Sequence, residues 1–153
     1  MSPIISETNT SFKWFILATA TFVTMLYAMN VTIASIALSD MRGAMGATQD
    51  QISWVVTGNI VATAIFTPFA GWLSSRIQIR TILFFSVIGF IISSIFCGMS
   101  DTLEEIVIAR VAQGIFGAPL PPLSQTLVLA VFPKRQISVA MAVWGMGTIL
   151  GPV

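Results

Sequence analysis

Arg110 is the residue of this sequence with the clearest potential for chemistry, because it is a cation within a long apolar stretch. Gln113, Gly114 and Gly117 follow it at spacings of three, four and seven residues, which places them with Arg110 on one helical face. A guanidinium and an amide beside little side-chain bulk suit a water-filled cavity. In lipid such a charge is costly and usually functional. The alternative is a structural anchor whose side chain extends to the outer surface.

Further polar residues recur at helical spacing. On a straight helix Pro121, Ser124 and Gln125 would extend the Arg110 face, and the prolines here permit a bend because they remove backbone hydrogen bonds. Two earlier segments carry polar faces of their own, at Tyr27 and Asn30 and at Asn59, Thr63 and Thr67. Together these faces indicate several helices around one polar interior, as in a transporter or channel.

Little in the sequence favours an enzyme or a metal centre. There is no histidine, and the one cysteine, Cys97, lies in an apolar run. Zinc sites use nitrogen and sulfur ligands, so we expect neither a metal nor an internal disulfide. No nucleophile, base and orienting group occur at a useful spacing. The net charge of +1 gives no basic surface for nucleic acid.

The composition is that of a protein surrounded by lipid. Of 153 residues, 56% are hydrophobic and 8% are charged, whereas soluble domains carry about 25% charged residues. So few charges cannot cover a water-facing surface of this size. We therefore expect an all-α membrane protein.

Five apolar segments alternate with short polar joints. We expect membrane-spanning helices at about residues 14–38, 52–73, 81–99, 103–132 and 137–153, after a polar tail at residues 1–13. A span such as 14–38 would be ~37 Å long, enough to cross a ~30 Å hydrocarbon core. Thr102 and Glu105 predict a capping box that opens the fourth span. Because the fifth span lacks a polar flank, we expect the chain to be part of a longer polypeptide.

Positive residues are distributed unequally between the two sides of the predicted membrane. One side holds Lys13, Arg76, Arg80, Lys134 and Arg135, and the opposite side holds Arg42 with most of the acidic residues. The positive-inside rule therefore predicts a cytoplasmic N-terminus.

Four segments resemble motifs of the major facilitator superfamily, in particular the fourteen-span drug:proton antiporters of the EmrB/QacA type. They are Asn30–Ser39, Gly71–Arg80, Arg110–Gln125 and Gly147–Pro152. The resemblance implies a helical bundle with about five transmembrane helices of the N-terminal lobe in this chain. It also implies a multi-pass protein of the bacterial cytoplasmic (inner) membrane, with two lobes that alternate access around a midplane site.

Three groups of residues carry the predicted functions. Arg110 matches the family's arginine linked with proton handling and the substrate cavity. The predicted transport cavity and proton pathway consists of Tyr27, Asn30, Asn59, Arg110, Gln113 and Gln125. The family's conformational latch matches Gly71, Arg76 and Arg80. The close-packed bend of exporters matches Gly147, Gly151 and Pro152.

The sequence departs from the family pattern at two aspartate positions, where Asn30 and Ser75 stand instead. An amide cannot carry a proton, and no predicted span contains a carboxylate. A proton-binding acid must therefore lie outside these spans, or Asp40 must serve from the outer rim. The proton gradient as energy source, with no cofactor, is implied by the resemblance alone.

Our leading hypothesis is a secondary active multidrug exporter, a drug:proton antiporter of hydrophobic and often cationic compounds. The resemblance adds a periplasmic adaptor and an outer-membrane channel as partners. One alternative is a major-facilitator exporter of a specific metabolite or siderophore, and another is a truncated, inactive membrane fragment. An enzyme is not expected.

Overall fold

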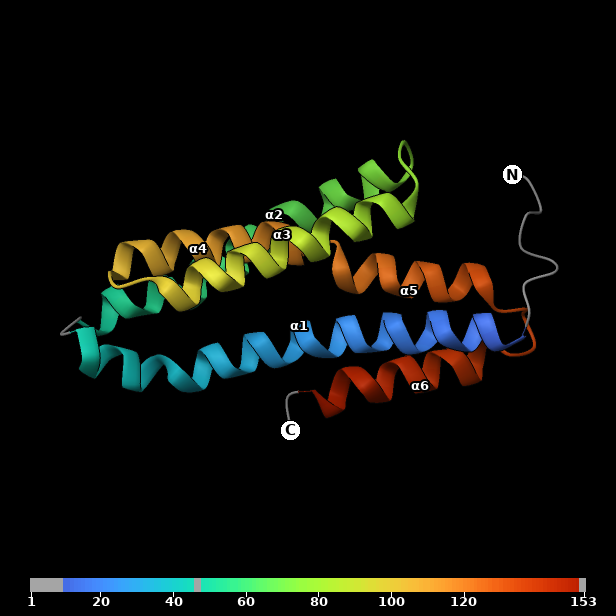
Figure 1. Ribbon diagram of the computed structural model, residues 1–153, viewed down its shortest axis with the longest axis horizontal. Coiled ribbons are helices and arrows are strands. Elements are labelled where there is room, and N and C mark those ends of the chain that lie inside the picture. Colours follow the sequence, from blue (N-terminus) through green and yellow to red (C-terminus); the bar gives the residue numbers. More distant parts are fainter. Residues whose placement is uncertain (1–9, 46–47, 152–153) are drawn as a thin grey trace.

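The computed structural model describes residues 10–45 and 48–151, and these form a bundle of helices (Figure 1). The six helices are α1 (Thr10–Met45), α2 (Gln49–Ser74), α3 (Ile79–Met99), α4 (Leu103–Gly117), α5 (Leu120–Val131) and α6 (Ile137–Leu150). The first joint is shorter than the polar segment between the first two predicted spans, because α1 continues to Met45. Most of the predicted tail and Pro152 lie outside the described residues.

Four helical stretches are long and apolar enough to cross a membrane, namely Ser11–Ala37, Asp50–Ser74, Ile79–Met99 and Leu103–Val131. The fifth predicted span contains the shorter apolar helix α6. Large apolar side chains lie on the outside of the bundle, among them Phe15, Ile36 and Phe96, which are 69%, 72% and 65% exposed. Such a surface is typical of a protein that contacts lipid or further helices. The prediction of an all-α membrane protein is confirmed.

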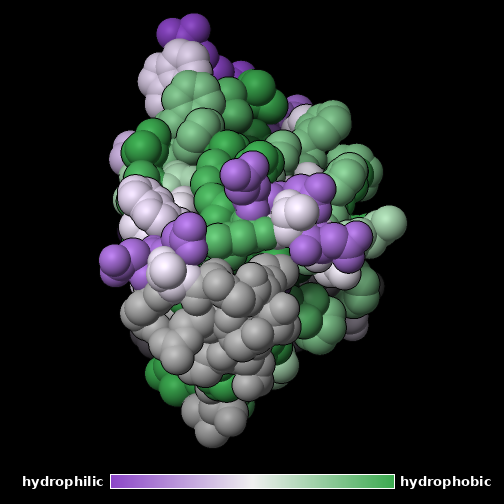
Figure 2. All heavy atoms as spheres, turned by 90° about the vertical axis from the view of Figure 1, so that its left-hand side faces the viewer, coloured by the Kyte–Doolittle hydropathy of each residue, from purple (hydrophilic) through white to green (hydrophobic). Residues whose placement is uncertain are grey.

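Successive spans alternate in direction, with α4 and α5 as the two halves of one span, so the joints between spans lie at two ends of the bundle (Figure 1). The start of α1, the α2–α3 joint and the α5–α6 joint lie at one end, and the α1–α2 and α3–α4 joints lie at the other. Figure 2 views this second end, where hydrophilic residues gather beside apolar surfaces. The basic joints that the sequence assigns to one side of the membrane therefore share one end of the molecule.

Capping boxes open two of the helices at the end shown in Figure 2. The predicted box at α4 is confirmed, because Thr102 Oγ1 accepts from the Glu105 N–H at 3.3 Å and Glu105 Oε2 accepts from the Thr102 N–H at 3.3 Å. Thr48 and Gln51 form the same reciprocal pair at the start of α2. Each box satisfies backbone donors that the first helical turn leaves free.

The fourth predicted span, at 103–132, corresponds to one apolar stretch, Leu103–Val131, that consists of two helices. α4 ends at Gly117 and α5 begins at Leu120, and the predicted bend lies between them. The physical reason is the proline group, because Pro119, Pro121 and Pro122 supply no N–H to the preceding turn. The division allows the two halves to pack against different neighbours.

The two halves of the fourth span have different main packing partners. α4 packs mainly against α2 and α3, whereas α5 packs mainly against α1 and, to a smaller and equal extent, against α3 and α6. α1 also packs extensively against α6. Figure 1 shows the two halves of the fourth span beside these different partners. The two sets of helices also contact each other directly, through α1 and α2, α3 and α5, and α2 and α5.

The contact between α2 and α4 depends on Gly114. A Cβ at this position would lie 2.5 Å from the Asn59 carbonyl oxygen and 2.8 Å from Ala62 Cβ. Thr63 Oγ1 donates to the Asn59 carbonyl at 2.9 Å and reaches the Gly114 carbonyl at 3.4 Å. The absence of a side chain thus lets two backbones approach closely, as is common between membrane helices.

Replacing Gly114 by leucine should separate α2 from α4 and destabilise the bundle by about 1–3 kcal/mol, the usual cost of overpacking. The measurement is the unfolding transition of the purified protein in detergent. Gly98→Leu is the matched control, because a Cβ at Gly98 would meet nothing within 4 Å among the described residues. Equal transitions for the two variants would contradict this description of the α2–α4 contact.

Candidate functional site

The guanidinium of Arg110 points into the bundle. The side chain is 8% exposed, and its Nη1 donates to Asn30 Oδ1 of α1 at 2.9 Å and to Gln113 Oε1 at 2.9 Å. Arg110 Nε is buried and has no hydrogen-bond partner in the described part of the chain. This geometry does not fit the anchor alternative, in which the side chain would extend to the outer surface.

Gln113 carries the hydrogen-bond network from Arg110 to α3. The Gln113 side chain is 1% exposed, and its Nε2 donates to Ser94 Oγ at 2.7 Å. Ser94 Oγ in turn donates to the Phe90 carbonyl at 2.8 Å. The network thus joins α1, α4 and α3. Ser94 was not among the predicted site residues, since a serine in an apolar helix usually bonds only to its own backbone.

Asn59 contacts the backbone of Arg110 and makes no recorded hydrogen bond to its guanidinium. Its Nδ2 donates to the backbone carbonyl of Arg110 at 3.0 Å, and the residue is 8% exposed. This bond joins α2 to the turn of α4 that carries Arg110. Asn59 is therefore a positioning residue in this structure.

The space beside Arg110 is small. Arg110 and Asn59 line a void of about 10 Å³ between α1 and α2, which corresponds to about one water molecule. Its other lining residues are aliphatic: Val31, Ala34, Val55, Val56 and Ile60. The sequence predicted a water-filled cavity from the small residues on the Arg110 face. In this structure Gly114 packs against Asn59 and Gly117 packs against Tyr27, so these small residues make close helix contacts. The transport cavity stays a prediction.

Two residues of the predicted cavity are not brought to Arg110. Tyr27 packs against Gly117 and against the ring of Phe90, whose centroid lies 6.0 Å away. Gln125 lies half-buried on α5, beyond the break in the fourth span. Of the predicted group, the structure therefore joins Asn30, Gln113 and Asn59 to Arg110.

The acceptors that hold the Arg110 guanidinium are neutral amides. The sequence has no Asp or Glu between Glu7 and Asp40, between Asp50 and Asp101, or after Glu105. Asp40 is ten residues beyond Asn30 on α1, a distance of ~15 Å along a helix. An arginine at the centre of a membrane helix costs about 2.5–3.5 kcal/mol. Hydrogen bonds to a charged group return about 1.5–3 kcal/mol each, but the acceptors found among the described residues are amides, which carry no negative charge.

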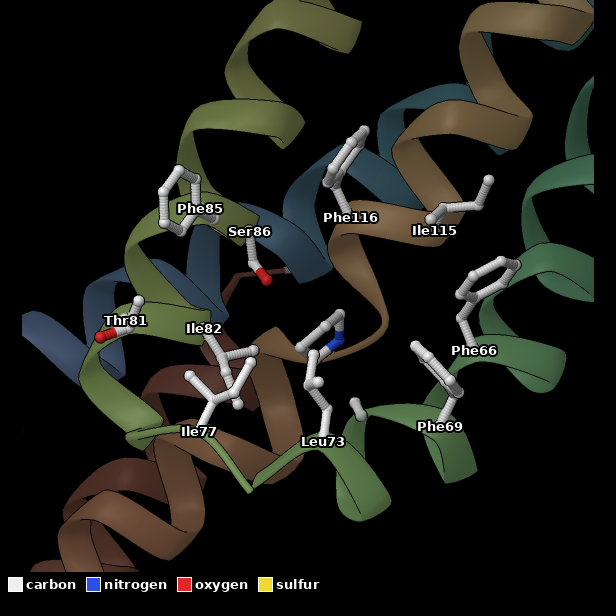
Figure 3. Close-up of a pocket in the computed structure, with 12 residues that line it drawn as sticks. Phe66, Phe69, Leu73, Ile77, Thr81, Ile82, Phe85, Ser86, Ile115 and Phe116 are labelled. Atoms are coloured by element: carbon white, nitrogen blue, oxygen red, sulfur yellow. The ribbon is translucent and has the colours of Figure 1, made fainter. Parts of the chain in front are cut away.

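The predicted latch residues are exposed and do not contact one another among the described interactions. The Arg76 guanidinium lies 4.7 Å from the ring centroid of Trp72, a cation–π contact. Arg80 lines an apolar groove with α1 and α5 residues, and a Cβ at Gly71 would meet nothing within 4 Å in the described structure. An apolar cavity of about 320 Å³ lies beside this turn (Figure 3), lined among others by Leu73, Ile77 and Phe116.

The predicted close contact of the fifth span is observed between α6 and α1. A Cβ at Gly147 would overlap Thr21 Cγ2, and a Cβ at Gly151 would lie 2.8 Å from the Met25 carbonyl oxygen. Small residues four apart thus allow α6 to approach the α1 backbone. Pro152, the third residue of this motif, lies outside the described residues.

Together, the apolar exterior and the buried polar network define a polytopic membrane protein with a charged group inside its helical bundle. The model of the Major Facilitator Superfamily matches residues 20–153. The chain therefore belongs to the major facilitator superfamily, a family of membrane transporters.

Comparison with known proteins supports the same family. The chain is 39% identical over 130 residues to the multidrug export protein EmrB of Escherichia coli (strain K12), covering 85% of this chain and 25% of EmrB. It is 36% identical over 125 residues to the fatty acid resistance protein FarB of Neisseria gonorrhoeae, covering 82% of this chain and 25% of FarB. The chain thus spans about a quarter of the length of these curated relatives.

A solved structure shares the fold. The bacterial homolog of the human lysosomal transporter Spinster, in an inward-facing and unoccupied conformation, matches with a TM-score of 0.83. The sequence identity is 19%, and the match covers 94% of this chain and 30% of that chain. The likeness confirms the predicted major-facilitator-type helical bundle.

Replacing Gln113 by leucine should destabilise the protein by about 2–3 kcal/mol, because it leaves a buried charged donor with one acceptor and removes the donor to Ser94. The unfolding transition of the purified protein in detergent measures this loss. Gln125→Leu is the matched control, since Gln125 is outside the network, and it should change stability by less than ~0.5 kcal/mol. A loss at Gln125 as large as that at Gln113 would show that the network adds nothing.

Proposed function

We propose that the complete protein is a secondary active exporter that exchanges hydrophobic compounds for protons by alternating access. The observation that carries this proposal is the buried Arg110 network, because intramembrane charges mark substrate and ion pathways. The comparisons support the proposal, since the chain belongs to a transporter family and is similar to a multidrug export protein.

The packing of the bundle fits a protein that changes conformation. The Arg110–Asn30 hydrogen bond links α1 to α4, although each of these helices packs mainly against other partners. A movement of α1 and α6 relative to α2, α3 and α4 would have to break this polar contact and rearrange the packing of α1 against α2. The break at Ala118–Pro119 gives the fourth span a place to bend during such a movement.

Proton exchange requires a group that titrates, and the amide of Asn30 does not. The proposal therefore assigns the proton to an acid outside the apolar spans of this chain. The predicted role of Arg110 in proton handling stays a prediction. So do the partnership with a periplasmic adaptor and an outer-membrane channel, and the bacterial inner membrane as location.

Cells that express the complete polypeptide should export the neutral dye Nile red faster than cells with an empty vector. Efflux-deficient bacteria are loaded with dye and energised, and the fall in fluorescence is followed. A protonophore should abolish the difference, because export by this proposal uses the proton gradient.

Two variants test whether the observed packing serves this activity. Gly147→Leu should lower Nile red efflux because its side chain would collide with Thr21, whereas a Cβ at Gly145 would meet nothing within 4 Å among the described residues. Gly145→Leu is therefore the matched control.

If the complete polypeptide reaches the membrane in normal amounts and exports no dye, this result would contradict the exporter and favour an inactive membrane protein. Efflux of a single metabolite and of no dye would favour the metabolite exporter.

The proposed orientation places the N-terminus in the cytoplasm. A Cys97→Ser background provides a chain without cysteine, into which Asp101→Cys or Gln136→Cys is introduced at an exposed position. In intact cells a membrane-impermeant maleimide should label the cysteine at 101, and it should label the cysteine at 136 after permeabilisation. The reverse pattern would contradict the orientation.

A further inference from the structure

A groove between α3 and α4 has two carboxylates at one end. Its volume is about 570 Å³, and its acidic residues are Asp101, at the α3–α4 joint, and Glu105, in the first turn of α4. This joint lies at the end of the bundle that Figure 2 views, where hydrophilic and apolar residues lie side by side. The groove therefore begins at the polar end of the spans and continues between two apolar helices.

The walls of the groove suit a hydrocarbon chain. Its small residues Ser93 and Ala109 are buried, whereas the larger side chains of Phe96, Met99 and Ile108 are exposed and form its edges. Ser93 Oγ donates to a backbone carbonyl of its own helix at 2.8 Å, so its hydroxyl hydrogen is already bonded. Below the carboxylates the groove is therefore mainly apolar.

The length of the groove matches one leaflet of a bilayer. Ser93 precedes Asp101 by eight residues on the α3 side, which is ~12 Å along a helix. Half of a bilayer's hydrocarbon core is ~15 Å thick. A chain that lies in this groove would therefore run parallel to the neighbouring acyl chains, with its polar end at the level of the carboxylates.

The two carboxylates are available to a cation. Glu105 Oε2 accepts from the backbone N–H of Asp101 at 3.1 Å and of Thr102 at 3.3 Å, which fixes the carboxylate at the start of α4. Among the described residues, Glu105 Oε1 and the Asp101 carboxylate have no recorded hydrogen bond or ion pair. An apolar helix placed over the groove would leave this negative charge without a partner, whereas a cationic amphiphile would complement it.

We propose that this groove binds a phospholipid whose headgroup carries a primary amine, such as phosphatidylethanolamine. One acyl chain lies between α3 and α4, and the ammonium donates to Asp101 and Glu105. A primary ammonium offers three N–H donors, whereas the quaternary ammonium of a choline headgroup offers none. The carboxylates therefore select the amine headgroup, and this inference does not depend on which compound the protein transports.

The test compares two lipids with identical acyl chains, palmitoyl-oleoyl phosphatidylethanolamine and palmitoyl-oleoyl phosphatidylcholine. The complete polypeptide is purified in a non-ionic detergent, and its affinity for each lipid is measured by native mass spectrometry. The natural protein should bind the ethanolamine lipid about 3–5-fold more tightly, the ratio expected of an exposed charge pair. The Asp101→Asn/Glu105→Gln double variant should lose this preference.

The same end of the bundle offers a matched control. Asp50 and Glu104 are exposed acids that do not line the groove, so Asp50→Asn/Glu104→Gln makes the same change of charge and should keep the preference. Glutamine at residue 105 preserves the capping box, because glutamine also serves at this position of the motif. The double variant should therefore fold, and elution as a single species checks this.

Ala112→Phe tests whether an acyl chain occupies the groove. Ala112 lines the groove and is half-buried, so a phenyl ring there should fill the space and weaken the binding of both lipids. Unchanged affinities in this variant would overturn the groove as the lipid site. Equal affinities of the natural protein for the two lipids, or equal loss of the preference in both double variants, would overturn the selection by Asp101 and Glu105. Absence of lipid binding would instead favour a further helix of the complete polypeptide over the groove.

Discussion

The structure depends on keeping one cation inside a bundle that lipid surrounds. Arg110 cannot be solvated by hydrocarbon, so its donors must find acceptors on neighbouring helices. Asn30 and Gln113 supply two such acceptors at 2.9 Å, and Ser94 extends the network to α3. Because amides carry no charge, this arrangement holds the guanidinium in position without neutralising it.

Close helix packing is the condition for that network. Gly114 lets α4 approach α2 closely enough for Asn59 to bond to the Arg110 carbonyl. On the opposite side of the bundle, Gly147 and Gly151 bring α6 against the α1 backbone. The proline break then allows the fourth span to serve both groups of helices. Glycine contacts and prolines therefore fix the geometry in which one charged side chain is tolerated.

The helical bundle could be predicted from the sequence because a span must be apolar and long enough to cross the hydrocarbon core. The sequence also identified Arg110, Gln113 and Asn30, because a buried charge and amides at helical spacing stand out in apolar helices. The prolines predicted a bend in the fourth span, but the sequence did not predict the contact with Ser94. The contact of Gly114 with α2 was also not predicted, because a small residue fits both an open cavity and a close contact. The structure distinguishes these two cases because it shows α2 in direct contact with Gly114.

An experimental structure of the complete protein tests the central claim most directly, because it shows every group around Arg110. Our account predicts that Asn30 and Gln113 lie within hydrogen-bond distance of the guanidinium in one conformation. It also predicts that no Asp or Glu side chain lies within ~4 Å, the range of a strong ion pair. A protein carboxylate bound to Arg110, or a guanidinium directed toward lipid, would contradict it.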